Sequence, residues 1–351
     1  MKRSTIKDIA RLASVSHATV SRALRRSPLV RPATAERIRN IAEQCGYRAS
    51  AAARSLVTSR TRTIGIVVTS ISDPFAAEVV AGIEDAANTC DYSVILANSN
   101  ALPEREMKVV TAFEERRVDG IIVTSSRVGA VYLERLSQAE VPIVLLNNQH
   151  PSEFVHSVMI DNVAASYEAT RHLIALGHRR IAYIGDRYGC QSDTERFGGY
   201  RSAMDGGYLP FDPGYVVHGD GKPEGGEQAM TALLALPARP TAVFCYNDMT
   251  ALGALQVIHA HGLEVPKHIS VVGFDDLFLA RYCVPALTTV RQPMREMGRL
   301  AFEALLKLRA GDDTHINLKV PGELIVRHST APPLEETQCN CLSGQTQTAA
   351  G

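Results

Sequence analysis

Hydrophobic positions at the start of the chain recur every three or four residues, which is the spacing of one buried helix face. The pattern predicts a first helix after Thr5, a second that begins at His17, and a third that opens at Pro32 and ends at Gly46. Thr5 and Ser16 supply the hydroxyl oxygens that helix N-terminal caps need. Two short helices joined by a tight turn are typical of a helix-turn-helix, whose second helix enters the major groove of DNA.

From Arg62 onward, short runs rich in β-branched residues alternate with helical segments, which predicts βαβ units and parallel sheets. Nine such strands are more than a single α/β domain usually contains. We therefore expect an α/β body of two doubly wound lobes that follows a small all-α head. A terminal strand is expected near residues 324–327. The nine predicted strands cover residues 63–69, 93–97, 120–125, 142–147, 157–161, 180–185, 242–247, 270–275 and 287–292.

Charge divides the chain at the same place. Residues 1–62 hold fourteen Lys and Arg against three acidic residues, a net charge of +11, whereas the whole chain sums to zero. Residues 63–351 therefore carry −11. A basic head on an acidic body favours a polyanionic partner, and DNA is the polyanion that suits a helix-turn-helix.

Composition and motifs exclude several classes. No stretch approaches the roughly 20 apolar residues of a membrane helix, and the N-terminus has no apolar core of a secretory signal. The seven scattered cysteines favour a reduced, cytoplasmic protein, and Cys339 and Cys341 lack a matching second pair, so we expect no metal and no cofactor. No nucleophile elbow, phosphate-cradling loop or zinc-protease motif occurs, so we do not expect an enzyme.

Polar residues collect where the predicted strands end. Because ligands of open α/β sheets bind just beyond the carboxyl ends of the strands, these residues are candidates for a binding site. The alternative is that they only cap the loops and helices that follow. The strand-end residues are Ser70, Asp73, Ser125, Asn147, Asp161, Asn247, Asp275 and Gln292.

Three stretches of the head carry a specific motif: residues 5–24 (TIKDIARLASVSHATVSRAL), 45–47 (CGY) and 51–56 (AAARSL). On these residues the chain resembles the lac-repressor (LacI/GalR) family, and the likeness continues to about Thr330. The resemblance implies a transcriptional regulator, chiefly a repressor, that binds a pseudo-palindromic DNA operator as a homodimer. Repression or activation at a given promoter stays open.

In that family, the residues that match His17, Ala18 and Arg22 meet base edges, and Arg22 would be bidentate to a guanine. Hydroxyl residues of the same helix would hold phosphates and fix the register. The resemblance implies DNA contacts for Thr5, Ser16, His17, Ala18, Thr19, Ser21, Arg22, Arg25, Tyr47, Ser50, Ala53 and Leu56.

The resemblance also implies a hinge helix that folds only on DNA and pairs with its dimer mate. Leu56 would enter the minor groove as a wedge that kinks the duplex, with Ala53 as its close-packed partner. The family usually has Pro-Asn where this chain has Ala49-Ser50, so the start of the hinge is less firmly fixed. A plain linker helix is the alternative.

The body resembles the periplasmic-sugar-binding-type core of the same family, in which the chain crosses between the lobes three times. The resemblance implies a DNA-binding domain at residues 1–48, a hinge at 49–61 and a core at 62–330. Residues 331–351 have low hydrophobicity and no coiled-coil heptads, so we expect a disordered tail and a dimer. The first lobe would comprise residues 62–162 and about 292–321, and the second about 163–291 and 322–330.

An effector would lie between the lobes, where arginine, aspartate and amide side chains suit a polyol. The family's frequent second aromatic is Ala76 here, and Gly221 replaces a stacking aromatic, so we favour a sugar or sugar derivative over a purine. Lys222 and Arg127 could reach an acid or a phosphate. The resemblance implies effector contacts for Phe75, Ser125, Asn147, Arg196, Asn247, Asp275 and Gln292.

Other functions remain as weaker alternatives. A purine- or protein-corepressed regulator of the same family would keep the head and change only the ligand. A free solute-binding protein would leave the basic head without a role. An architectural DNA-binding protein would have no need of polar residues at matching strand ends.

Overall fold

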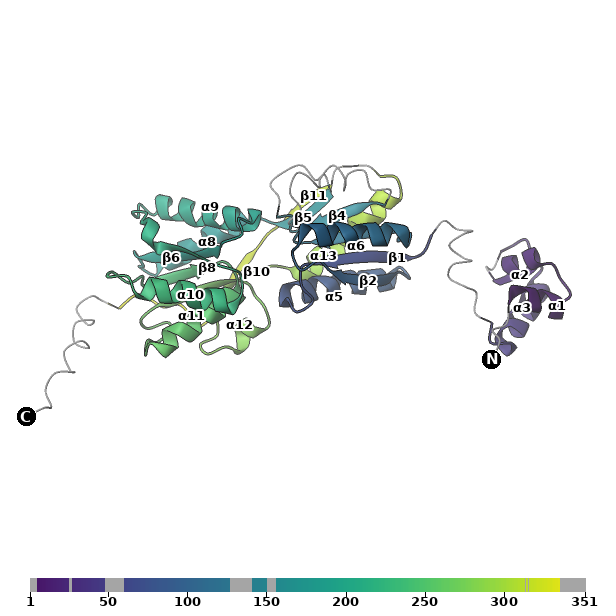
Figure 1. Cartoon of the computed structure of the whole chain (residues 1–351), viewed down its shortest axis with the longest axis horizontal. Helices are drawn as coiled ribbons and strands as arrows, with labels where there is room; N and C mark the ends of the chain where they lie inside the picture. Colours follow the sequence, from purple (N-terminus) through teal and green to yellow (C-terminus); the bar gives the residue numbers. More distant parts are fainter. Residues whose placement is uncertain are drawn as a thin grey trace, which may run out of the picture. The chain divides into compact units, whose positions relative to one another are not determined.

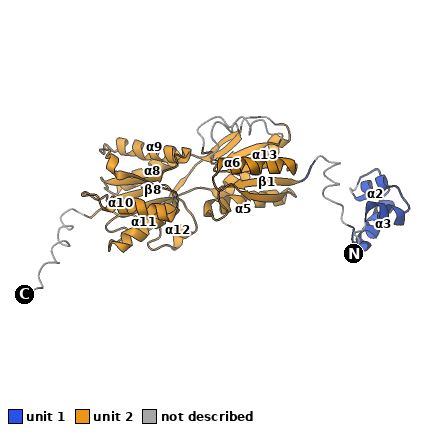
Figure 2. Ribbon diagram, in the orientation of Figure 1, with its two compact units in different colours: residues 1–61 blue, residues 62–351 orange. Residues whose placement is uncertain are grey.

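The computed structural model of the chain describes residues 5–24, 27–47, 60–126, 141–149, 156–312, 314 and 316–334 (Figure 1). The chain divides into two compact units, Met1–Thr61 and Arg62–Gly351, which are coloured separately in Figure 2. Across the described ranges, no helix is both long enough and apolar enough to cross a membrane.

The described residues of the first unit contain three short helices: α1 (Ile6–Leu12), α2 (His17–Leu24) and α3 (Pro32–Gln44). The predicted capping box before α1 is present, because Thr5 and Asp8 bond each other's backbone N–H groups. Before α2, the Ser16 hydroxyl oxygen accepts from the Thr19 N–H at 3.1 Å. Both helices therefore begin at the residues that the sequence predicts.

The apolar faces of these helices meet in one small core. Ile9, Val20 and Ile38, one from each helix, are fully buried there. Arg37 of α3 donates to the carbonyl oxygen of Ala13 at 3.0 Å, which ties the third helix to the turn of the helix-turn-helix. The core thus fixes the orientation of α2 within the head.

The second unit contains two sheets, each with six strands among the described residues. The first sheet has the order β11-β5-β4-β3-β1-β2 and is parallel throughout. The second has the order β12-β10-β9-β8-β6-β7, in which β12 alone is antiparallel to its neighbour. The strands are β1 (Thr63–Val68), β2 (Ser93–Asn98), β3 (Gly120–Thr124), β4 (Ile143–Leu146), β5 (His156–Ile160), β6 (Ile181–Asp186), β7 (Val216–Gly219), β8 (Ala242–Cys245), β9 (Ser270–Asp275), β10 (Thr288–Arg291), β11 (Ile316–Val320) and β12 (Glu323–Ile325).

Helices cover both faces of each sheet (Figure 1), which confirms the predicted doubly wound architecture. Helices α5 and α13 pack on one face of the first sheet and α6 on the other. On the second sheet, α10 and α11 lie opposite α8 and α9. Where the structure describes this unit, its helices are α5 (Pro74–Thr89), α6 (Pro103–Glu115), α8 (Asn162–Ala175), α9 (Gln191–Gly206), α10 (Pro223–Leu234), α11 (Asp248–Ala260), α12 (Leu279–Tyr282) and α13 (Met294–Arg309), with a 3-10 turn η1 (Pro213–Tyr215).

The chain passes between the two sheets three times, from β5 to α8, from β10 to α13 and from β11 to β12. Each of the nine predicted strands overlaps a strand of the structure, whereas β7 and β11 were not predicted. Both are edge strands, and β11 reads Ile-Asn-Leu-Lys-Val without a continuous apolar run. Edge strands need less apolar sequence because one side faces solvent.

Several predicted strands run past the observed strand ends, and two of them do so by one residue at Ser125 and Asn147. Both residues have a left-handed backbone, with φ of 48° and 50°, so the chain turns away from the sheet there. At the end of β9, Asp275 has φ of 117°. These turns place three polar side chains at the carboxyl edges of the sheets.

Candidate functional site

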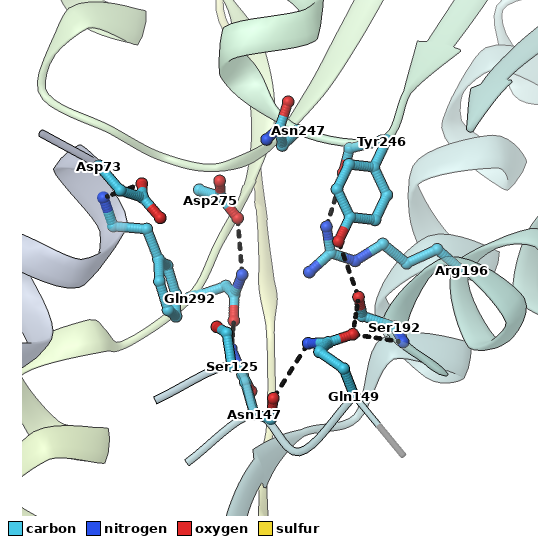
Figure 3. Close-up of a pocket in the computed structure, with 11 residues that line it drawn as sticks. Asp73, Ser125, Asn147, Gln149, Ser192, Arg196, Tyr246, Asn247, Asp275 and Gln292 are labelled. Carbon is cyan, nitrogen blue, oxygen red and sulfur yellow. Dashed lines mark hydrogen bonds between the residues drawn. The ribbon is translucent and has the colours of Figure 1, made fainter. Parts of the chain in front are cut away.

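A pocket opens at the carboxyl ends of strands from both sheets, as Figure 3 shows. The non-atom space within it, part of which is open solvent, is about 390 Å3. Its lining consists of Asp73, Phe75, Ser125, Asn147, Gln149, Ser192, Arg196, Tyr246, Asn247, Asp275 and Gln292.

All seven residues that the sequence assigned to an effector site line this one pocket. The first sheet contributes residues after β1, β3 and β4, and the second contributes residues after β8 and at the end of β9. Helix α9 supplies Arg196, and the segment between β10 and α13 supplies Gln292. Sequence reasoning therefore placed residues more than 200 positions apart around one cavity, although their contact with an effector stays a prediction.

Arg196 is buried, with 4% of its surface exposed, and its guanidinium is held on several sides. Its Nε donates to Asn162 Oδ1 at 2.9 Å and its Nη1 to the Tyr246 carbonyl oxygen at 2.6 Å. The guanidinium carbon lies 3.7 Å from the centre of the Phe274 ring and 4.8 Å from that of Tyr246. Such packing and bonding fix a guanidinium in one orientation before any ligand arrives.

Gln292 connects polar groups of the two sheets. Its amide nitrogen donates to Asp275 Oδ1 at 2.6 Å, and its amide oxygen accepts from Asn147 Nδ2 at 3.5 Å. Burial raises the pKa of Asp275 to about 7, while the nearby Arg196 and the Gln292 hydrogen bond oppose this rise and Asp73 adds to it. The carboxylate is therefore poised between its charged and neutral forms near neutral pH.

A second polar connection crosses the pocket through Gln149. Its Oε1 accepts from the Ser192 backbone N–H at 3.2 Å and from the Ser192 hydroxyl at 2.8 Å. The same hydroxyl lies 2.8 Å from Tyr246 Oη. Sequence reasoning missed these three residues, although each is close in the chain to a predicted one: Gln149 follows Asn147 by two positions and Tyr246 precedes Asn247.

Two of the pocket residues also cap helices. Asn247 Oδ1 accepts from the Thr250 N–H at 2.8 Å, and its Nδ2 donates to the Gly221 carbonyl at 3.0 Å, so the side chain has a structural role. Asp73 caps α5 by accepting from the Phe75 N–H at 3.0 Å. Burial raises the pKa of Asp73. The capping alternative thus holds for these residues, yet both still face the pocket.

Two further strand-end residues lie outside the pocket lining. Asp161 caps α8 through the Ala164 N–H, and Ser70 bonds Ser72 in the loop after β1. Lys222 precedes α10 and does not line the pocket, while Arg127 lies outside the described residues. Within the described ranges, no group of three or more His, Cys, Asp or Glu side chains could hold a metal ion.

The candidate DNA-binding face lies on α2 of the head. His17, Ala18 and Arg22 are exposed on this helix, with Thr19 and Ser21 half-buried beside them. The cap residues Thr5 and Ser16 use their hydroxyl groups within the head, and the half-buried Tyr47 packs against its core. Four predicted DNA contacts lie outside the described residues: Arg25, Ser50, Ala53 and Leu56.

The predicted hinge, residues 49–61, is described only from residue 60. At the other end, the structure describes the chain to Leu334, and Ala331 accepts hydrogen bonds from Ser270 Oγ at 3.0 Å and His178 Nε2 at 2.9 Å. Ordered structure therefore extends past residue 331, the residue at which the predicted tail begins. Residues 335–351 lie outside the described ranges.

A helix-turn-helix head joined to a two-lobed α/β core with a polar pocket defines a DNA-binding regulator that responds to a small molecule. Residues 5–50 match the family of bacterial regulatory proteins named lacI, and residues 170–330 match the periplasmic binding protein-like domain. The chain is 37% identical to the HTH-type transcriptional regulator RegA of Clostridium saccharobutylicum over 93% of this chain and 99% of RegA. The chain belongs to the lacI family, and is a transcriptional regulator rather than an enzyme.

Solved structures agree with this assignment. The lac repressor dimer bound to operator and the anti-inducer ONPF superposes with a TM-score of 0.86 at 27% identity, covering 94% of this chain and all of that one. The complex of the transcriptional regulator CelR with cellobiose gives a TM-score of 0.71 at 32% identity, covering 93% of this chain and all of that one. The family resemblance that the sequence carries is thereby confirmed.

Proposed function

We propose that this regulator is a homodimeric repressor whose affinity for a pseudo-palindromic operator is controlled by a hydroxyl-rich metabolite, a sugar or sugar derivative, in the pocket. The observation that carries this proposal is the lining, where a fixed guanidinium, two carboxylates and four amide side chains surround one cavity. Paired donors and acceptors of this kind match the hydroxyl groups of a polyol. The cellobiose bound to the CelR relative supports the same class.

The pocket explains how a ligand could control the DNA-binding head. Residues from both sheets line it, so a ligand that contacts both sides would favour a closed arrangement of the two lobes. The lobe built on β1 is continuous with the linker to the head, and a change in that lobe would shift the hinges of a dimer. The effect cannot exceed the difference in ligand affinity between the two arrangements. We favour release of DNA, that is induction, because the lining suits a sugar.

Two aromatic rings, Phe75 and Tyr246, line the pocket, and the Tyr246 ring is already in contact with another side chain. The Tyr246 ring packs on the Arg196 guanidinium, which leaves Phe75 as the main apolar surface. A flat purine gains most of its affinity from stacking, so this lining favours a sugar over a purine corepressor.

On the DNA side, the exposed residues of α2 would read base edges and Leu56 would bend the duplex at the centre of the operator. Replacing Leu56 by Ala should reduce bending and specific affinity while ligand binding stays intact. Bending equal to that of the wild type, measured by gel mobility with permuted sites, would remove the wedge from the proposal.

The first test is a thermal-shift screen of the purified protein against neutral sugars, amino sugars, sugar acids, sugar phosphates, polyols, nucleosides and purines. A ligand at 100 times its dissociation constant should add about 2.7 kcal/mol to the unfolding free energy, which is visible in Tm. A compound that raises Tm is then tested for its effect on an operator selected from random DNA. A nucleoside or purine as the only binder would contradict the sugar class.

A further inference from the structure

The charge balance of the pocket limits which polyol can bind, an inference that rests on the proposed function. Among the described residues of the lining, two side chains are acidic, Asp73 and Asp275, and one is basic, Arg196. In the view of Figure 3, the two carboxylates lie on one side of the pocket and the guanidinium on the other. The lining therefore carries one more negative charge than positive when both carboxylates are ionised.

Arg196 is already partly engaged within the protein. Two of its nitrogen atoms donate to Asn162 and to the Tyr246 carbonyl, and aromatic rings pack on its guanidinium. Its positive charge acts on Asp275, where it favours the ionised carboxylate. Arg196 and Asp275 therefore offset each other in the net charge of the lining, and the described lining holds no second basic side chain to offset Asp73.

At each helix N-terminus of the pocket, one backbone N–H group already has a side-chain acceptor. These ends attract anions because their N–H groups are unpaired and the helix dipole is positive there. Asp73 caps α5, Asn247 caps α11, and Gln149 Oε1 accepts from the Ser192 N–H in the first turn of α9. An acidic ligand would have to compete with these side chains for the backbone donors.

Asp73 adds a charge that its capping role does not require. Asparagine caps helices about as well as aspartate, because the cap needs only a side-chain oxygen. Asp73 and Asp275 both line the pocket and lie on the same side of it in Figure 3, and the charge of Asp73 adds to the rise in the pKa of Asp275. A second negative charge next to a ligand-facing carboxylate is unfavourable for the empty protein and would be relieved only by hydroxyl donors or a cation.

We propose that Asp73 is a specificity-determining residue, which reserves the pocket for polyols without negative charge, neutral sugars and amino sugars, and rejects their uronic acid and phosphate counterparts. Hydroxyl and ammonium groups donate to carboxylates, whereas a ligand carboxylate or phosphate would face Asp73 and Asp275 together. Among amino sugars, an ammonium placed near Asp73 would gain the attraction that an acid loses.

The test uses sets of sugars that differ only in charge: glucose with glucosamine, glucuronate and glucose 6-phosphate, and the corresponding galactose and mannose sets. Dissociation constants are measured by calorimetry at pH 7.5 for the wild type, Asp73→Asn and Glu84→Gln. Asp73→Asn keeps the cap of α5 and removes the charge, whereas Glu84→Gln removes the same charge from an exposed position of the same helix, outside the pocket.

In any set that binds, the wild type should prefer the neutral or amino sugar over the acid by at least about tenfold, since like charges repel strongly where water is partly excluded. Asp73→Asn should reduce this preference to within about threefold, and Glu84→Gln should leave it unchanged. The role of Asp73 would be overturned if an acid bound the wild type as tightly as its neutral counterpart, or if the preference persisted in Asp73→Asn. Either result would still be consistent with a ligand-responsive regulator. Failure of every set to bind any of the three proteins would overturn a hexose of these three kinds as the effector of the proposed function, and the charge preference inferred for it.

Discussion

Asp275 combines features that are unfavourable in an ordinary folded residue. It is 5% exposed, its backbone has φ of 117°, and its carboxylate accepts from the neutral amide of Gln292. Strain and burial of this kind persist where the surroundings enforce them, and they are common at binding sites. We expect the ionised carboxylate to be the form that accepts ligand hydroxyl groups.

The raised pKa of Asp275, about 7, gives ligand binding a pH dependence. As pH falls below this value the free protein is protonated, so affinity should fall by up to about tenfold per pH unit, and it should level off above about pH 8. Binding near pH 7 should release a proton, because the ligand favours the ionised form. Calorimetry in buffers of different ionisation enthalpy measures both effects, and a flat profile from pH 6 to 8 would refute this role for Asp275.

Asp275→Asn should abolish the ligand response while operator binding persists.

The same variant tests the raised pKa of Asp275 without a ligand. Because the folded pKa is raised above the unfolded value, the folded wild type binds more protons, and its stability falls as pH rises from about 4 through 7. The Tm of Asp275→Asn should therefore exceed that of the wild type by a margin that grows toward pH 8. An unchanged margin would mean that the carboxylate is not destabilised by burial.

Arg22 is the residue on the head for which base reading can be tested most directly. Its side chain is exposed on α2, and a bidentate contact with guanine contributes roughly 1–3 kcal/mol of discrimination. Arg22→Ala should relax the preference at one base pair of each half-site and leave the rest of the selected motif intact. Selection of operators from random DNA with both proteins gives the comparison, and identical motifs would exclude base reading by Arg22.

At the level of elements, helices α8 and α9 are held together by a close backbone approach at Gly199. A Cβ atom there would lie 2.4 Å from the Val163 carbonyl oxygen and 2.9 Å from the Tyr167 amide nitrogen, both on α8. The neighbouring Gly198 has no atom within 4 Å of an added Cβ. Two adjacent glycines of one helix therefore have opposite environments.

Gly199→Ala should destabilise the protein by about 1–3 kcal/mol, because the clash is with backbone that cannot rotate away. Gly198→Ala should be neutral or stabilising by up to about 1 kcal/mol, since alanine favours a helix interior. The first variant should also weaken ligand binding, because the bond between Asn162 on α8 and Arg196 on α9 depends on this packing. Urea unfolding with ligand titration measures both, and equal effects of the two variants would contradict the packing explanation.

The elements also show how far sequence reasoning extends. Apolar runs and polar residues at their ends were enough to predict nine strands and the edge at which a ligand would bind, and the family resemblance selected Arg196 from helix α9. The sequence did not predict Gln149, Ser192 and Tyr246 as pocket residues. Their placement depends on hydrogen bonds between segments that lie 43 and 54 residues apart in the chain. Local patterns carry no information about such pairings. Likewise, β11 is recognisable only by its pairing with β5, from Ile316 opposite His156.

At the level of the whole molecule, the two functions depend on charge in different ways. The basic first 62 residues, with a net charge of +11, should make operator binding strongly dependent on salt, because neutralised phosphates release counterions. For roughly 6–10 phosphate contacts, affinity should fall by about 10³–10⁵ between 50 and 200 mM salt. Binding of a ligand without net charge should change little over the same range. A strong salt dependence of ligand binding would instead indicate an ionic ligand.

Because the effector and the DNA operator bind the same protein, the effect of each on the affinity for the other must be reciprocal. If the effector lowers operator affinity by a given factor, saturating operator must lower effector affinity by the same factor, commonly between about 5 and 150. We expect equal factors from effector titrations with and without operator and from operator titrations with and without effector, at one fixed salt concentration. Asp275→Asn should abolish the effector dependence in both directions, whereas Arg22→Ala should weaken operator binding and keep the factor. Unequal factors would show that a further equilibrium, such as dissociation of the dimer, links the pocket to DNA.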